Sequence, residues 1–265
     1  MTATMTELSA IARAANTFAY AGAVVFVSLA LIMSFRRGGI HPLLLVCISA
    51  ISISWIEAPY DWAVYAQFPP ALPRMPSWWP LNMTWGGGLP AAVPPGYIAY
   101  FVLPAVIGVA VSRWLIARFQ LRAPITLLNV GLVVGSLWAL VFNGIVGAQL
   151  GVFYYGRMIE GLALWEGTRH QYPLYDALAM GVQMMVFTYL LGRTDAQGRT
   201  PIEAWADSKP TSRSRASLRS IGAVIVIGHV VYLSVFAPHL ATKVLQLQTV
   251  GPTEQLFEGV PNQPL

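Results

Sequence analysis

Six long apolar runs decide what this chain can fold into. Each holds about 20 mostly apolar residues, which is the length that an α-helix needs to cross the hydrocarbon core of a bilayer. Of the 265 residues, 56% are hydrophobic and 10% are charged, whereas a typical soluble domain is roughly 25% charged. The sequence therefore predicts an all-α, polytopic membrane bundle that forms a single integral membrane domain over residues 1–265. We expect its helices over residues 16–35, 41–60, 97–115, 125–146, 174–191 and 221–240.

Most of the cations gather in three clusters between the apolar runs. The clusters are Arg36 with Arg37, the segment from Arg113 to Arg122, and residues 193–220. Basic loops of membrane proteins face the cytoplasm, so we expect these three on the cytoplasmic side and both termini on the other side. The same rule accounts for the net charge of +5. We therefore expect the lipid bilayer and a lipophilic small molecule as partners, and not nucleic acid.

Residues 67–95 cannot form a spanning helix, because they contain eight of the 19 prolines and three consecutive glycines. The segment also holds Trp78, Trp79 and Trp85, which are too many aromatic residues for a disordered linker. We predict a long Pro/Trp-rich extracytoplasmic loop that covers the mouth of the bundle. Residues 148–173 form a second polar, aromatic-rich loop on the same side.

The end of the second apolar run carries two carboxylates, in the segment WIEAPYDWAVY at residues 55–65. Glu57 and Asp61 are four residues apart, so on a helix they share one face. A carboxylate in or near a bilayer normally faces a bundle interior or a water-filled cavity, and it is then a candidate functional group. The alternative is an interfacial belt, in which the Trp and Tyr rings anchor at headgroup level and the acids meet water.

Polar residues of other helices are expected at the same end of the bundle. Asp176 lies in the first turn of the fifth helix, where a helix cap or dipole partner is the alternative interpretation. Asn143 continues a row with Asn129 and Ser136, and the spacing of seven places this row on one face that we expect to point into the protein. The predicted catalytic residues are Glu57, Asp61 and Asp176, and the predicted substrate-binding residues are Trp55, Tyr60, Trp62, Tyr65, Trp85, Asn143, Gln149, Tyr172, Gln183 and His229.

Carboxyl groups that share an apolar pocket need not ionise together, so one can act as a general acid while another acts as a base. Such a set suits acid/base work on a lipophilic substrate. The chain has no Walker loop, and its four histidines lack the paired helical spacing of a metalloprotease. We therefore expect neither a metal nor a cofactor.

The layout of a small polytopic bundle resembles the AveC-like spirocyclase family of actinobacteria. The resemblance rests on the segment at residues 55–65, on the run from Trp78-Trp79-Pro80 to Trp85, and on GAQLGVFYY at residues 147–155. It extends over residues 20–240. It implies an integral membrane enzyme of polyketide biosynthesis that closes a dihydroxy-ketone into a spiroketal, in some members with dehydration.

Two other functions fit the same residues. In a membrane terpene cyclase, a protonated carboxyl group starts a cation cascade and aromatic rings stabilise the cations. In a lipid-binding or transport-associated bundle, the acids carry protons or hold helices together. Neighbouring genes for polyketide synthases or for oxidoreductases acting on lipids would favour the spirocyclase, whereas genes for a prenyltransferase and an epoxidase would favour the terpene cyclase.

Overall fold

The computed structural model describes residues 10–85, 87–208, 212–253 and 255–257. Its elements in chain order are α1 (Ala10–Arg37), α2 (Pro42–Ile53), the 3₁₀ turn η1 (Ser54–Ile56), α3 (Glu57–Ala63), β1 (Ala66–Gln67), α4 (Val93–Phe119), α5 (Ala123–Ala139), the π-helix η2 (Leu140–Gln149), β2 (Tyr154–Tyr155), β3 (Ala163–Leu164), β4 (Tyr172–Pro173), α6 (Leu174–Gly192), α7 (Pro201–Asp207) and α8 (Arg213–Val244). Within these residues, six helical segments are long and apolar enough to cross a membrane. The predicted fold class, an all-α polytopic bundle, is confirmed.

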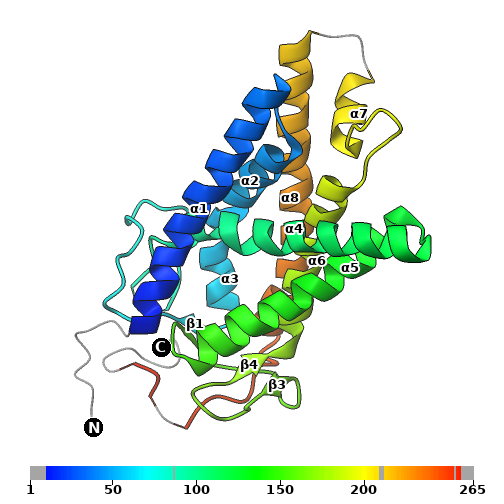
Figure 1. Ribbon diagram of the computed structural model, residues 1–265. Helices are drawn as coiled ribbons and strands as arrows, with labels where there is room; N and C mark the ends of the chain where they lie inside the picture. Colours follow the sequence, from blue (N-terminus) through cyan, green and yellow to red (C-terminus); the bar gives the residue numbers. More distant parts are fainter. Residues whose placement is uncertain (1–9, 86, 209–211, 254, 258–265) are drawn as a thin grey trace.

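The first span, α1, is a peripheral helix. Only 11% of its most apolar stretch is buried inside the protein, and Figure 1 shows it lying along the outside of the bundle. It packs on α4 and α2. Gly22 of α1 meets Ala99 of α4, and Gly96 of α4 meets Ala19 of α1, so small side chains let the two helices approach closely.

The second span is not one regular helix, although the sequence predicted one over residues 41–60. His41 caps its start, because the ring Nδ1 accepts a hydrogen bond from the Leu43 N–H at 3.1 Å, and Pro42 takes the first helical position. The 3₁₀ turn η1 then separates α2 from α3. Pro59 explains this break, since it has no N–H to donate to the carbonyl of Trp55. Glu57 and Asp61 thus lie on a short separate helix, α3.

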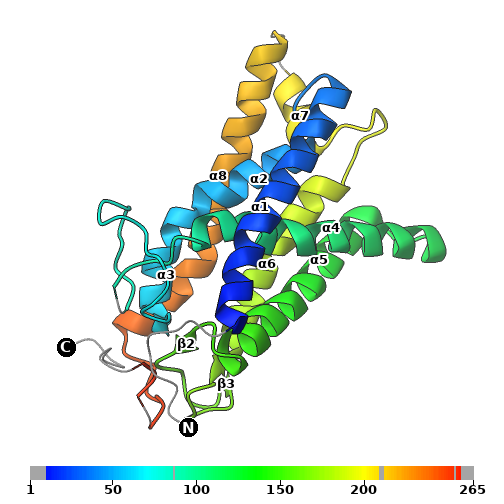
Figure 2. The ribbon, with the colours of Figure 1, turned by 60° about the vertical axis from the view of Figure 1, so that its left-hand side comes forward.

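The third and fourth spans form a pair that crosses the other helices. In both Figure 1 and Figure 2, α4 runs across α6 and α8, and α5 returns beside it. Helix α4 begins earlier than predicted, because Pro94 and Pro95 lie in its first turn, where no N–H is needed. Helix α5 packs tightly on α6, where Gly135 faces Gly181. It continues into the π-helix η2.

Residues 193–220 were predicted as a solvated loop, and the structure differs from that prediction. They contain α7 and the first turns of α8. The start of α7 is a capping box, in which the Glu203 carboxylate accepts from both the N–H and the hydroxyl of Thr200. Glu203 also pairs with Arg37 at the end of α1, at 2.6 Å. This ion pair joins two of the three predicted cytoplasmic segments.

The two aromatic loops pair with each other at the opposite end of the bundle. Strand β1 lies antiparallel to β2, with Ala66 opposite Tyr155, and β3 pairs with β4. Arg74 stabilises the long loop by donating to the carbonyls of Gly88 and Pro69 at 2.8 and 2.9 Å. In Figure 1 the β-strands lie at the lower end, and the α1–α2 turn and α7 lie at the upper end.

Candidate active site

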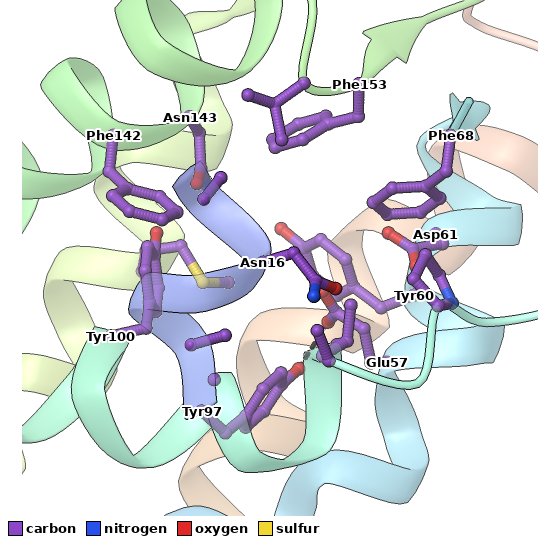
Figure 3. A pocket seen from close by; sticks show the side chains of 18 of the residues that line it. Asn16, Glu57, Tyr60, Asp61, Phe68, Tyr97, Tyr100, Phe142, Asn143 and Phe153 are labelled. Atoms are coloured by element: carbon purple, nitrogen blue, oxygen red, sulfur yellow. Dashed lines mark hydrogen bonds between the residues drawn. The ribbon is translucent and has the colours of Figure 1, made fainter. Parts of the chain in front are cut away.

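One cavity of about 150 Å³ lies where the two aromatic loops meet the helices. The three predicted catalytic residues, Glu57, Asp61 and Asp176, all line it. The first two come from α3 and the third from the first turn of α6, so the chain brings them together from segments more than a hundred residues apart. Figure 3 shows Glu57 and Asp61 beside Tyr60 on one side of this cavity.

Asp176 is the most heavily hydrogen-bonded of the three carboxylates. It is 1% exposed. Its Oδ1 accepts from the Tyr60 hydroxyl at 2.6 Å, and its Oδ2 accepts from the Asn143 amide and the Tyr172 hydroxyl, each at 3.0 Å. Tyr155 lies at 3.5 Å from Oδ2. Because these donors come from α3, η2 and the loop before α6, Asp176 joins separate parts of the fold in addition to occupying a helix start.

Glu57 is held by two tyrosines from different helices. Its Oε2 accepts from the hydroxyls of Tyr97 on α4 and Tyr232 on α8, and the two hydroxyls also contact each other. The Tyr232 hydroxyl lies 2.9 Å from Oε2. The sequence analysis did not include these tyrosines among the site residues. Tyr97 sits four residues after the start of α4, and only the folded arrangement brings it to Glu57.

Asp61 differs from the other two, because its Oδ2 is buried and has no hydrogen-bond partner in the described part of the chain. The residue is 4% exposed. A buried carboxylate oxygen without a donor is costly, so this atom is chemically available to a hydroxyl group of a molecule that enters the cavity.

The cavity wall is mainly aromatic. Phe68 and Phe153 meet at a ring distance of 5.5 Å, and Tyr100 and Phe142 meet edge to face at 5.3 Å. All four line the cavity and are labelled in Figure 3. Ring faces carry negative electrostatic potential, so a wall of this kind can stabilise a positive charge that develops on a substrate.

Helix α1 closes one side of the cavity with small side chains, the ring of Phe18 and one polar group. The small residues are Ala12, Ala15 and Ala19, and the polar residue is Asn16. Asn16 was not predicted, because it lies at the beginning of an apolar run in which nothing marks it as facing inward. The cavity therefore joins a peripheral helix to the central carboxylates.

Two of the predicted substrate-binding residues, Tyr60 and Asn143, line the cavity, and both also hydrogen-bond to Asp176. Tyr172 contacts the same carboxylate from outside the lining. Asn143 faces inward, but Asn129 at the other end of its predicted row is exposed. The row was predicted for one continuous α-helix, but only Asn129 and Ser136 lie in α5, and the wider turns of the π-helix η2 change the spacing from Ser136 to Asn143.

Three predicted binding residues lie outside the cavity because they surround a lysine. Trp62, Tyr65 and Trp85 enclose the ammonium group of Lys243, whose Nζ lies 3.1 Å from the centre of the Tyr65 ring and 4.8 and 4.7 Å from the two Trp rings. Tyr65 follows the end of α3 with a left-handed φ of 55°. Trp85 therefore attaches the Pro/Trp-rich loop to the end of α8 and does not itself reach the carboxylates.

The remaining predicted binding residues also lie outside the cavity lining. The Trp55 indole donates to Nε2 of His229 at 3.0 Å, and neither residue lines the cavity. The Gln149 amide lies 3.5 Å from the His170 carbonyl. Gln183 is fully buried in α6, and both atoms of its amide lack a hydrogen-bond partner among the described residues.

Two loop tyrosines beside Asp176 keep their protons over a wide range of pH. Burial, and after it the charge of Asp176, raises the pKa of Tyr155 and that of Tyr172 well above the usual value. Both hydroxyls therefore keep their protons at neutral pH. In the described ranges, no group of three His, Cys, Asp or Glu side chains is arranged to hold a metal ion.

Comparison with known proteins identifies one family. The family model described as "Spirocyclase AveC-like" matches residues 35–263, which is most of the chain. The matched part includes every residue of the carboxylate cluster and excludes nearly all of α1. No curated protein and no solved structure matches the chain.

Proposed function

The chain belongs to the AveC-like spirocyclase family, and on that premise we propose that it is a membrane-embedded cyclase that closes a lipophilic dihydroxy-ketone, such as a polyketide, into a spiroketal. The family supports a cyclase-type role, and the six apolar helices are consistent with a multi-pass membrane protein. The observation that carries the proposal is the meeting of Glu57, Asp61 and Asp176 on one cavity with an aromatic wall.

The chemistry needs one proton donor and one proton acceptor. In the hemiketal formed from the ketone and the first hydroxyl, a carboxyl group gives its proton to the hydroxyl on the hemiketal carbon. The C–O bond to this hydroxyl then breaks, water departs, and the substrate becomes an oxocarbenium ion. The second hydroxyl of the substrate then attacks that carbon, and a carboxylate takes its proton as the new C–O bond forms. One proton is given and one is taken, so the reaction needs no cofactor.

The residues around the carboxylates fit these two steps. Asp61 has a carboxyl oxygen without a partner among the described residues, so this group is free to exchange a proton with a substrate hydroxyl. The rings of Phe68, Tyr100 and Phe142 line the space in which the oxocarbenium ion would lie, and their faces favour a cation. Small apolar side chains of α1 exclude water from the same space and give a hydrocarbon substrate a dry wall.

A membrane terpene cyclase would use the same aromatic wall, so the wall alone does not separate the two reactions. The family membership favours spiroketal formation. A non-enzymatic, lipid-binding role would need no proton donor and acceptor on one cavity. Incubation of purified protein with a dihydroxy-ketone and with a linear prenyl substrate separates these cases, because each of the two cyclases gives a product from only one of them.

The decisive experiment is product formation by Glu57→Gln and Asp61→Asn, with thermal stability measured alongside. An amide keeps the shape of the side chain but cannot exchange the proton, so we expect rate losses of roughly 10² to 10⁴-fold. Asp207→Asn, at an exposed position of α7, is the matched control and should retain the rate. Full activity in both cavity variants would leave the carboxylates without a catalytic role.

A further inference from the structure

The cavity reaches the surface of the protein on the side of α1. Of the residues that line it, only Phe18 is exposed, at 36%. The Pro/Trp-rich loop also contributes to the lining, but its residues Phe68, Leu72 and Pro90 are buried. The described residues therefore close the cavity beneath this loop and leave an open edge beside Phe18.

This edge faces lipid and not water. Phe18 belongs to the first span, and Phe142, which also lines the cavity, belongs to η2 at the end of the fourth span. Large apolar side chains are exposed on both helices: Val24 on α1 is 66% exposed, and Val141 and Ile145 on η2 are 47% and 45% exposed. Exposed apolar surface of this kind on spanning helices meets the acyl chains of the bilayer.

The contact between α1 and η2 is much weaker than the contact between α1 and α4. Helix α1 packs closely on α4, where Gly22 meets Ala99, but only loosely on η2. In Figures 1 and 2 the start of α1 lies beside the end of the helix that α5 and η2 form. The rings of Phe18 and Phe142 close the space between them, with their centres 5.9 Å apart. Two side chains, and not two packed backbones, therefore separate the cavity from lipid.

One of these two rings is fixed and the other is free to turn. Phe142 stacks on Trp138 at 5.6 Å and meets the edge of Tyr100 at 5.3 Å, and Figure 3 shows it beside Tyr100 at the cavity. Among the described residues, Phe18 has no ring contact other than Phe142. A rotamer change of Phe18 alone would thus connect the cavity to the bilayer.

We propose that the edge between Phe18 and Phe142 binds the hydrocarbon tail of the substrate. This inference rests on the proposed function and names the substrate class, which is a long-chain compound that is dissolved in the bilayer and carries its oxygen atoms near one end. The oxygen-bearing end lies at Glu57, Asp61 and Asp176, and the tail passes between the two rings into lipid. Such a substrate enters sideways, and its tail never has to cross water.

The proposal is specific to this chain, because Phe18 lies outside the part that the family model matches. The neighbouring lining residues of α1 fit a chain of methylene groups, since Ala15 and Ala19 leave room beside the ring. Asn16 is the polar exception on this helix, and it faces the carboxylate end of the cavity in Figure 3. The polar and apolar parts of the cavity thus match the two ends of one amphiphilic molecule.

The first test needs neither turnover nor a variant. A hexadecanol that carries a diazirine beside its hydroxyl is added to the protein in lipid nanodiscs and photolysed, and a butanol with the same group serves as the short-chain probe. We expect the hexadecanol probe to label the peptide around Met180, which lines the cavity and is 3% exposed, several-fold more than the butanol probe does at equal concentration. Equal labelling by the two probes, or hexadecanol label only on lipid-facing residues such as Val24, would overturn the proposal.

The second test locates the point of entry. Phe18→Trp fills the edge and Phe18→Ala clears it, so label at Met180 should appear more slowly in the first variant and faster in the second when samples are illuminated at increasing times after mixing. Phe35→Ala is the matched control, because Phe35 lies on the same helix, is 89% exposed and does not line the cavity. Leu72→Ala opens the cavity beneath the loop instead. If this variant accelerates labelling and the Phe18 variants change nothing, the tail enters under the loop and the proposal is wrong.

The third test uses the reaction and separates a tail-binding role of Phe18 from packing. With dihydroxy-ketones of increasing chain length, Phe18→Trp should raise KM for the long members several-fold, leave KM of the shortest member nearly unchanged and leave kcat in place. An equal rise of KM at every length would mean that Phe18 only supports the fold. If the wild type cyclises none of these compounds, the proposed reaction fails, while the labelling experiments still decide whether the edge admits a long chain.

Discussion

Gly22 on α1 lies so close to Ala99 on α4 that a Cβ atom at position 22 would stand 2.5 Å from the Ala99 methyl carbon. Real side-chain contacts do not come this near, so the two helices touch along their backbones at this point. The contact matters for the site, because the residues of α1 just before Gly22 form one wall of the cavity.

We expect Gly22→Ala to push α1 away from α4. Overpacking of this kind costs about 1 to 3 kcal/mol, and the displaced wall should raise KM for the substrate more than it lowers kcat. Gly222→Ala on α8 is the control, since a Cβ there meets nothing within 4 Å. Thermal unfolding and steady-state kinetics of both variants test the prediction. Equal behaviour of the two would show that α1 is not held by this contact.

The lysine enclosed by Trp62, Tyr65 and Trp85 should stabilise the end of α8 and the Pro/Trp-rich loop together. Lys243→Met keeps most of the length of the side chain and removes the charge, so we expect it to lower the free energy of unfolding by about 1 to 2 kcal/mol. Arg215→Met, at an exposed position near the start of the same helix, should have little effect. Chemical denaturation followed by tryptophan fluorescence measures both. A stabilised Lys243→Met protein would mean that burial of the ammonium group outweighs its contacts with the rings.

His41 should make stability depend on pH. Burial, and after it the charge of Arg37, lowers the pKa of His41 below its usual value of about 6.5. The folded state therefore favours the neutral ring, which accepts from Leu43, and this contribution is complete above pH 6.5 and is lost as the pH falls through the lowered pKa. We expect the melting temperature of the wild type to fall between pH 7.5 and pH 5 by more than that of His41→Asn, which caps the helix without titrating. Equal falls in the two proteins would contradict this.

Sidedness remains a prediction from the basic loops. Ser77 lies in the Pro/Trp-rich loop and Ser208 at the end of α7, and both are exposed. The native Cys47 is 2% exposed, so single cysteines can be introduced without interference. An impermeant thiol reagent should label Ser77→Cys from outside intact cells and Ser208→Cys only after the membrane is opened. Labelling of both from the same side would reverse the prediction that the carboxylates lie at the extracytoplasmic end.

Apolar run length predicted the spans well, because the bilayer allows few alternatives to a helix of about 20 residues. The grouping of Glu57 with Asp61 also followed from their spacing, since both stay on one short helix. Asp176 could be expected at the same end because successive spans alternate in direction, which fixes which helix ends share a side. All three features depend on the lengths and the order of the segments, which can be read from the sequence.

The parts that sequence reasoning missed depend on local geometry or on packing. Thr200 and Glu203 have the spacing of a capping box, which predicts the start of α7. The segment was instead interpreted as a solvated loop because of its basic charge. The π-helix η2 changed the rotation between Ser136 and Asn143, and the residue pattern does not predict such a segment. The contact of Glu57 with Tyr97 and Tyr232 joins three spans, so it follows only from how the helices cross.

The peripheral position of helix α1 affects how the protein should be purified and assayed. Its outer surface meets lipid along most of its length, and in a bilayer there is no hydrophobic force that drives such a helix onto its neighbours. Small side chains in close contact and the Arg37–Glu203 ion pair hold it to the bundle. Detergent molecules can compete for the same surface, so we expect the cavity wall formed by α1 to depend on the choice of detergent. Rates from nanodiscs of native-like lipid, and not from short-chain micelles, will report on the intact pocket.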